Sequence, residues 1–257
     1  MRGLVVPWIP RIFLDIDRVS PTRRPSGRAA LRQSWLHLLF LHWPVPMEAL
    51  RPLIPPRLEI DTYEGRAYIG LVPFTMTGVR PVWSPAVPGL SDFHEVNVRT
   101  YVHLDGRDPG VWFLSLDASS RLAVLVARAT YHLPYRFARM SLERDPAGAV
   151  SYSSERLWPG PRPARCAMRY WPTGPALAAA EGTLAHFLAE RYVLYAERRG
   201  RIFRGRVHHD PYPLQPAGFA DLDESLVAAA GVNRGAGTPL AHYAQGVSVE
   251  VFGLSEC

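Results

Sequence analysis

None of the 257 residues is a lysine, and all 29 basic side chains belong to arginine. An enzyme that holds its substrate as a lysine Schiff base needs a nucleophilic lysine amine. The chain therefore cannot use that chemistry. The phosphate-binding loop GxxxxGK[ST] is excluded for the same reason, and the dinucleotide motif GxGxxG does not occur either.

Cysteine and long apolar runs are also scarce. Cys166 and Cys257 are the only two cysteines and form no CxxC pair, which favours a reducing compartment over a disulfide framework. The apolar run at the N-terminus is broken by Pro7 and Pro10 and is too short for a secretory signal. No segment approaches the ~18 apolar residues of a membrane span. We expect a cytoplasmic protein without a membrane partner.

The arrangement of arginine and histidine residues indicates neither a nucleic-acid-binding surface nor a metal site. The formal charge is +6, but the arginines are scattered and form no basic stripe interleaved with aromatic residues. The nine histidines form no HxH, HxxxH or HExxH motif, whereas a metal site needs three or four convergent donors. We expect no nucleic-acid partner, no metal and no other cofactor.

The 25 prolines and 20 glycines divide the chain into short segments, which favours strands. The dense apolar run 34–43 predicts a buried strand. Short turns predict antiparallel hairpins at 64–65, 105–106, 146–148 and 199–200. Apolar spacing predicts helices over 117–132, 183–190 and 221–230.

These elements predict an α+β protein with a mostly antiparallel, curved β-sheet or a β-barrel or cone, and three or four packed helices. No linker interrupts the chain after residue 30, so we expect residues 31–257 to form a single domain. Residues 1–30 form an N-terminal extension in this interpretation, either mobile or draped over the domain.

The segment 93–103 is the most informative for function. Strand alternation places Glu95, Asn97, Arg99, Tyr101 and His103 on one face, and three valines with Thr100 on the other. A solvated outer face with ion pairs would explain this pattern. A cavity lined by convergent polar groups would explain it equally well.

The segment 110–120 is the hairpin partner of that strand. Alternation places Phe113, Ser115 and Asp117 on one of its faces. Asp117 stands before a predicted helix, so it is either an N-cap or a site residue. Ser115 has no GxSxG context and is not expected to be a nucleophile.

Further candidates are histidines and aromatic residues. His42 is interpreted as a buried, hydrogen-bonded imidazole or as an acid/base group. Trp43, Tyr192 and Tyr212 suit the wall of a pocket, and they suit an ordinary core as well.

Several sequence strings resemble a known bacterial family. They are FLHWPVP (40–46), GLVPF (70–74), PGL (88–90), NVRTYV (97–102), GVWFLSLDAS (110–119), LPY (133–135), ERYVLY (190–195), HHDPYPLQ (208–215) and HYAQGVSV (242–249). Together they are similar to the domain-of-unknown-function family 2071, over about residues 34–254.

The resemblance implies a fold related to acetoacetate decarboxylase, a curved antiparallel β-structure around a cavity. In that enzyme a lysine pair follows a strand and faces the cavity, and the comparable stretch here is Ser115-Leu116-Asp117. The decarboxylase activity is therefore not implied. A carboxylate of the relative is loosely similar to Glu95.

Three hypotheses follow for the function. The first is a small-molecule cavity centred on Glu95, Asn97, Arg99, Ser115 and Asp117, with acid/base chemistry on a carbonyl or carboxylate compound. Its catalytic residues are Glu95 as the base, Arg99 neutralising an anion, and Asp117. The second is a non-catalytic binding or sequestering module for a hydrophobic or aromatic ligand, walled by Trp43, Tyr101, Phe113, Tyr192 and Tyr212. The third is a fully packed scaffold that acts through its surface. A homo-oligomer is left open.

Overall fold

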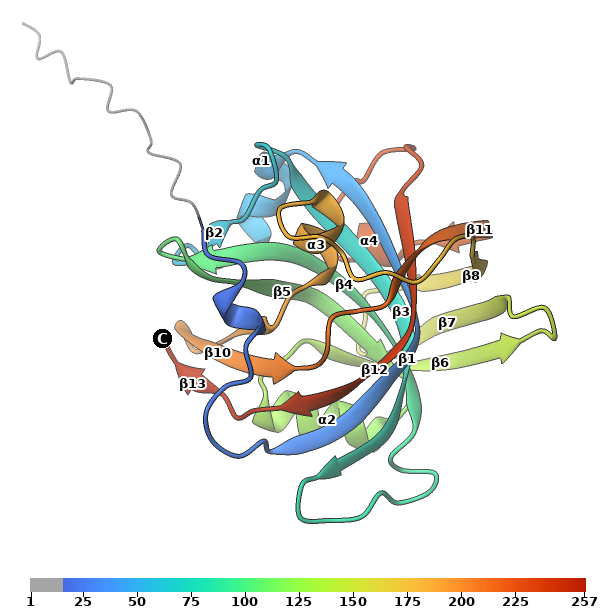
Figure 1. Ribbon diagram of the computed structural model, residues 1–257, viewed down its shortest axis with the longest axis horizontal. Helices are drawn as coiled ribbons and strands as arrows, with labels where there is room; N and C mark the ends of the chain where they lie inside the picture. Colours follow the sequence, from blue (N-terminus) through green and yellow to red (C-terminus); the bar gives the residue numbers. More distant parts are fainter. Residues whose placement is uncertain (1–15) are drawn as a thin grey trace, which may run out of the picture.

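A computed structural model describes residues 16–257, and a single curved β-sheet dominates it (Figure 1). Its strands are β1 (Leu31–Val45), β2 (Glu59–Ile60), β3 (Ala67–Pro81), β4 (Phe93–Leu104), β5 (Arg107–Ala118), β6 (Tyr135–Arg144), β7 (Val150–Trp158), β8 (Arg165–Pro172), β9 (Val193–Arg198), β10 (Arg201–His208), β11 (Leu214–Glu224), β12 (Leu240–Val251) and β13 (Ser255–Glu256). The helices are short: η1 (Ser20–Thr22), α1 (Met47–Leu50), η2 (Arg51–Leu53), α2 (Arg121–Thr130), α3 (Leu184–Ala189) and α4 (Leu226–Ala229).

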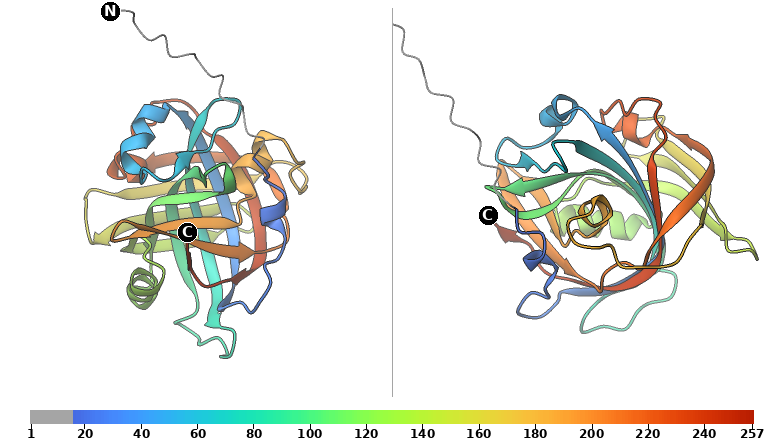
Figure 2. Two further views of the ribbon diagram at one scale, coloured as in Figure 1. Left: turned by 90° about the vertical axis from the view of Figure 1, so that its left-hand side faces the viewer. Right: turned by 45° about the horizontal axis from the view of Figure 1, so that its top comes forward.

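The strand order is β13-β10-β9-β5-β6-β7-β8-β11-β12-β1-β3-β4-β2. All neighbours are antiparallel except that β5 runs parallel to both β6 and β9. Two further pairings, β5 with β4 and β10 with β12, bring distant parts of this order together. The sheet is therefore strongly curved, and Figure 2 shows α3 within the curve. The predicted α+β class with a mostly antiparallel curved sheet is confirmed.

Three of the four predicted hairpins are confirmed. They join β4 to β5, β6 to β7 and β9 to β10. The turn at Glu64-Gly65 also forms, with Tyr63 bridged to Arg66. The short strand before it, β2, pairs with β4 and not with β3, so this turn does not connect two long paired strands.

The predicted helices form, with corrections at their ends. Ser120 is the N-cap of α2, because its hydroxyl oxygen accepts a hydrogen bond from the Ala123 amide at 3.2 Å. Asp117 therefore lies within β5 and caps nothing. Thr183 is the N-cap of α3, because its hydroxyl oxygen accepts a hydrogen bond from the His186 amide. The helix predicted over 221–230 is wrong in its first half, since residues up to Glu224 belong to β11.

Strands β1, β3 and β4 are buried on both faces, which explains the unbroken apolar run of β1. On β1, Leu39 and Leu41 pack into one core with β7 and β8. Leu38 and Phe40 point to the other side and pack with residues of β3 and β5. These strands are therefore a wall between two interiors.

Residues 16–30 lie against the sheet. Arg206 of β10 donates to the backbone carbonyls of Pro21 and Arg23, and Arg24 forms an ion pair with Glu250 of β12. Residues 1–15 of the predicted extension lie outside the described residues. The division of the chain at residue 30 stays a prediction. No helix among residues 16–257 is long and apolar enough to cross a membrane.

Candidate functional site

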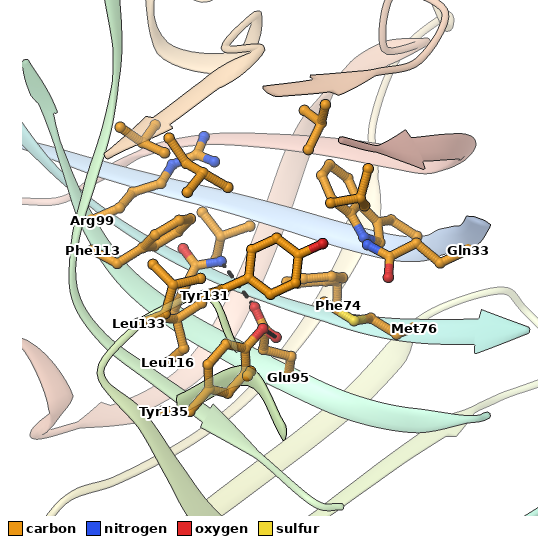
Figure 3. Close-up of a pocket in the computed structure, with 18 of the residues that line it drawn as sticks. Gln33, Phe74, Met76, Glu95, Arg99, Phe113, Leu116, Tyr131, Leu133 and Tyr135 are labelled. Atoms are coloured by element: carbon orange, nitrogen blue, oxygen red, sulfur yellow. Dashed lines mark hydrogen bonds between the residues drawn. The ribbon is translucent and has the colours of Figure 1, made fainter. Parts of the chain in front are cut away.

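The interior that faces Leu38 and Phe40 contains a cavity of about 190 Å³ (Figure 3). Strands β1, β3, β4 and β5 supply one wall, and α2 and the segment 191–194 supply others. Most lining residues are apolar or aromatic. The polar exceptions are Gln33, Glu95, Asn97, Arg99 and Arg191. The polar face of β4 is thus turned into a cavity at these positions and not toward solvent.

Glu95 is the acidic group of this cavity, and its residue is only 1% exposed. One carboxylate oxygen accepts a hydrogen bond from the Tyr135 hydroxyl at 2.6 Å, and the other lies 3.5 Å from the Asn97 amide nitrogen. No cation lies within ion-pair distance of it among residues 16–257. Burial raises the pKa of Glu95 to about 7, although the two hydrogen bonds act in the opposite direction.

Arg99 is the nearest arginine in the sequence, and it enters the same cavity from β4. One of its terminal nitrogens donates to the Leu188 carbonyl at 3.0 Å, and its guanidinium lies over the rings of Phe40 and Tyr101. Its Nε is buried without a hydrogen-bond partner in the described part of the chain. Within residues 16–257 no carboxylate forms an ion pair with Arg99.

The predicted position of Ser115 and Asp117 on the cavity side is wrong, because a β-bulge interrupts the alternation of β5. Val98 pairs with Ser115, but the next residue of β4, Arg99, pairs with Phe113. Leu114 is the extra residue, and both it and Ser115 face the opposite core. Phe113 and Leu116 line the cavity on either side of the bulge.

Asp117 therefore forms a buried ion pair in the other interior. The Arg156 guanidinium donates two hydrogen bonds of 2.8 Å to its two carboxylate oxygens, and both side chains are almost fully buried. This bidentate geometry is a structural pairing of charges. The catalytic role predicted for Asp117 does not fit this position.

His42 and Tyr101 lie beside the cavity wall, in a second layer of buried polar groups. The His42 Nε2 atom lies 2.6 Å from the Tyr101 hydroxyl, which also lies 2.7 Å from the Leu188 carbonyl. Burial holds the pKa of His42 well below its ordinary value, so the imidazole is neutral. Neither residue belongs to the cavity lining of the described chain, and α3 covers Tyr101 through Phe187.

The predicted aromatic walls divide into two groups. Phe113 and Tyr212 line the cavity. Tyr192 donates to Glu190 at 2.6 Å and stacks on His209 outside the lining. Trp43 packs in the opposite core, with its indole nitrogen donating to the Gly237 carbonyl.

Sequence reasoning missed three residues of the site: Tyr135, Arg191 and Gln33. Tyr135 and Arg191 occur in the strings LPY and ERYVLY, which contributed to the family resemblance. Nothing in those strings indicated a chemical role for either residue. Arg191 is balanced by Asp61, which accepts from its guanidinium at 2.7 Å. Strand alternation indicated cavity residues only within β4. The three missed residues belong to other parts of the chain, so the pattern of β4 could not reveal them.

Residues 16–257 contain no candidate site for a bound metal ion. No group of three or more His, Cys, Asp or Glu side chains is gathered there that could hold one.

Solved structures similar to this chain share its fold at low sequence identity. An acetoacetate decarboxylase from Legionella pneumophila is 8% identical with a TM-score of 0.62, covering 99% of this chain and 98% of that one. The enduracididine biosynthesis enzyme MppR, complexed with the condensation product of pyruvate and imidazole 4-carboxaldehyde, is 13% identical with a TM-score of 0.60 and 90% coverage of both chains. The fold is therefore acetoacetate-decarboxylase-like.

Sequence comparisons are more specific. The uncharacterized protein YqjF of Bacillus subtilis (strain 168) is 40% identical over 221 residues, which cover 86% of this chain and 90% of YqjF. The model of the domain-of-unknown-function family 2071, described as an uncharacterized conserved protein, matches residues 32–248. The chain belongs to the domain-of-unknown-function family 2071.

Proposed function

We propose that the cavity binds a small carbonyl or carboxylate compound and that Glu95 transfers a proton on it. The observation that carries this proposal is the state of Glu95. Its carboxyl group lies in the cavity wall, has no cationic partner among residues 16–257, and has its pKa raised to about 7. A pKa near neutrality suits a group that both takes and returns a proton.

The chemistry follows from the groups around the cavity. Deprotonated Glu95 removes a proton from the carbon next to a carbonyl, and the electron pair of that C–H bond moves toward the carbonyl oxygen. The Tyr135 hydroxyl, 2.6 Å from Glu95, keeps the carboxyl group oriented. Arg99 stabilises negative charge on the substrate. Returning the proton to another position completes an isomerisation that needs no lysine.

The solved structures of the same fold support the choice of compound. Among them are MppR complexed with pyruvate, MppR complexed with a condensation product of pyruvate, and an acetoacetate decarboxylase. Pyruvate and acetoacetate are both small oxo acids with acidic C–H bonds next to a carbonyl. This chain has no lysine and cannot form a Schiff base with an oxo acid. Proton transfer next to the carbonyl is the step that its own residues can perform.

The test is deuterium exchange followed by proton NMR. Pyruvate and acetoacetate are incubated separately with the protein in D2O, and loss of the signal from protons next to the carbonyl is compared with a protein-free blank. The wild-type protein should accelerate the loss. Glu95→Gln should lower the acceleration by about 100-fold or more, the ordinary contribution of a general base.

Glu190→Gln is the matched control. Glu190 is also buried, accepts a 2.6 Å hydrogen bond from a tyrosine and has its pKa raised by burial, but it lies outside the cavity lining. It should keep the wild-type exchange rate. Equal losses in both variants, or an unchanged rate in Glu95→Gln, would remove Glu95 from the mechanism.

A second candidate function is binding without catalysis. The mainly apolar and aromatic lining, including Phe113 and Tyr212, favours it. Native mass spectrometry of freshly purified protein should then show a co-purified compound whose mass does not change during incubation. A compound that is consumed would favour the enzymatic function instead.

The proposed setting is the cytoplasm, with a small molecule as partner and neither nucleic acid nor membrane. Cys166 and Cys257 are both free thiols, which suits a reducing compartment. Assembly into a homo-oligomer remains open to a measurement of molar mass in solution.

A further inference from the structure

The charges of the cavity do not balance. Arg191 pairs with Asp61, which it shares with Arg18. Glu95 carries at most part of a negative charge at neutral pH because its pKa is about 7. Arg99, which is only 8% exposed, has no carboxylate partner among residues 16–257. A buried cation without a counter-ion is costly, and aromatic rings and a carbonyl compensate only part of that cost. An anion supplied by the ligand would remove the imbalance.

The contacts of Arg99 leave room for that anion. Only one of its terminal nitrogens is engaged, by the Leu188 carbonyl. The Nε is buried without a partner in the described chain. A guanidinium in this state can still donate to both oxygens of a carboxylate.

The size of the cavity indicates the rest of the ligand. An apolar cavity of about 150 Å³ is sufficient to hold benzene, and the volume here is about 190 Å³. The residues beyond Glu95 include Phe74, Met76 and Phe93, all apolar. Pyruvate alone would leave this apolar part unfilled.

We infer that the ligand is a monocarboxylate carrying a compact apolar group about the size of a phenyl ring. Its carboxylate is bound by Arg99, and its ring lies against Phe74, Met76 and Phe93. Figure 3 shows Arg99 and Met76 on opposite sides of the cavity with Glu95 between them. In this arrangement the atoms between the carboxylate and the ring lie next to Glu95. The binding mode deepens the proposed function, and only the reaction at Glu95 rests on that proposal.

The experiment compares three probes by ligand-observed NMR titration against the full chain. Phenylpyruvate has both features, pyruvate lacks the ring, and phenylacetone replaces the carboxylate with a methyl group. Phenylpyruvate should bind at least about tenfold more tightly than pyruvate, because even one methylene in an apolar pocket contributes about that factor. It should bind about 30-fold or more tightly than phenylacetone, the lower range for loss of one partner of a buried charge pair.

Two variants test the placement. Arg99→Met keeps the length of the side chain and should abolish the preference for phenylpyruvate over phenylacetone. Arg139→Met, which removes an exposed arginine of β6, is the control and should change nothing. If Arg99→Met fails to fold, Arg99→Gln serves the same purpose, since it also removes the charge.

The outcomes separate this inference from the proposed reaction. Binding of phenylpyruvate is measured separately from deuterium exchange, so binding without exchange would support the anion site while contradicting the proposed reaction. Equal affinities for pyruvate and phenylpyruvate would overturn the apolar part of the inference. Equal affinities for phenylpyruvate and phenylacetone, an unaltered preference in Arg99→Met, or no binding of any probe would overturn the anion site.

Discussion

Two buried carboxyl groups of this protein differ in what surrounds them. Asp117 receives two hydrogen bonds from Arg156, whereas Glu95 receives one from the neutral Tyr135 hydroxyl and a long one from Asn97. Burial raises the pKa of Asp117 as well, but the paired Arg156 cation acts against burial and stabilises the anion. Glu95 is held near its titration point by burial. The residue type alone does not distinguish them.

Glu95 makes the stability of the protein depend on pH. Its pKa rises from an ordinary 4.5 to about 7 on folding, so the folded state binds the proton more tightly. The stabilisation that this shift gives the folded state is fully present below about pH 4.5 and is lost as the pH rises through 7. The difference corresponds to about 3 kcal/mol. Urea unfolding measures this at pH 5 and pH 8.5. Between these two pH values the free energy of unfolding should fall more in the wild-type protein than in Glu95→Gln.

No difference between the two proteins would mean that Glu95 keeps an ordinary pKa, and the opposite trend would contradict a raised pKa. Other groups titrate in both proteins, so only the difference between them reports on Glu95.

The ion pair of Asp117 and Arg156 gives a different prediction. Arg156→Met leaves a buried carboxylate without a partner and should lower the free energy of unfolding by about 3–5 kcal/mol. The double variant Asp117→Leu, Arg156→Met removes both charges and should recover most of that loss. Urea unfolding checks both. A double variant less stable than the single one would show that the pair contributes net stability.

At the scale of elements, the bulge in β5 decides which residues face the cavity. Strand β4 alternates regularly from Glu95 to Tyr101, but in β5 Leu114 has no partner of its own between Ser115 and Phe113. Alternation correctly indicates that Glu95, Asn97 and Arg99 share a face. It fails for Ser115 because one unpaired residue reverses the alternation of everything beyond it.

Deletion experiments test this account of β5. Deleting Leu114 restores regular alternation and leaves Leu116 on the cavity side, so it should cost only about 2 kcal/mol for a partly buried leucine. Deleting Trp112 should abolish folding. It moves Pro109 to the place of Gly110, where a Cβ would lie 2.6 Å from the Val193 carbonyl oxygen. Circular dichroism and urea unfolding measure both, and equal damage by the two deletions would contradict the register described.

At the scale of the whole molecule, one carboxylate connects three distant parts of the chain. Asp61 forms ion pairs with Arg191, which lines the cavity, and with Arg18 of the N-terminal segment. The Arg191 side chain is 2% exposed and that of Arg18 is 25% exposed. The two pairs should therefore differ in energetic weight.

Asp61→Asn leaves Arg191 buried without a counter-ion and should lower the free energy of unfolding by about 3–5 kcal/mol. Arg18→Ala removes only the more exposed partner and should cost about 1 kcal/mol or less. Thermal and urea unfolding of both variants provide the comparison. Similar losses would mean that the N-terminal segment is as firmly bound as the core of the protein.

The sequence by itself determined the features that depend on neighbouring residues. The absence of lysine excludes a Schiff base, Gly-containing turns locate three hairpins, and alternation places the polar groups of β4 on one face. Each rests on covalent chemistry or on the local geometry of a strand, which a few adjacent residues specify.

Only the tertiary structure decided what those polar groups meet. Tyr135 lies 40 residues from Glu95, and Arg156 lies 39 residues from Asp117. Such contacts arise when strands far apart in the chain pair around a curved sheet, and burial between them then sets the charge of each group. The missing lysine removed one reaction, and the enclosure of Glu95 and Arg99 in one cavity is what suggests another.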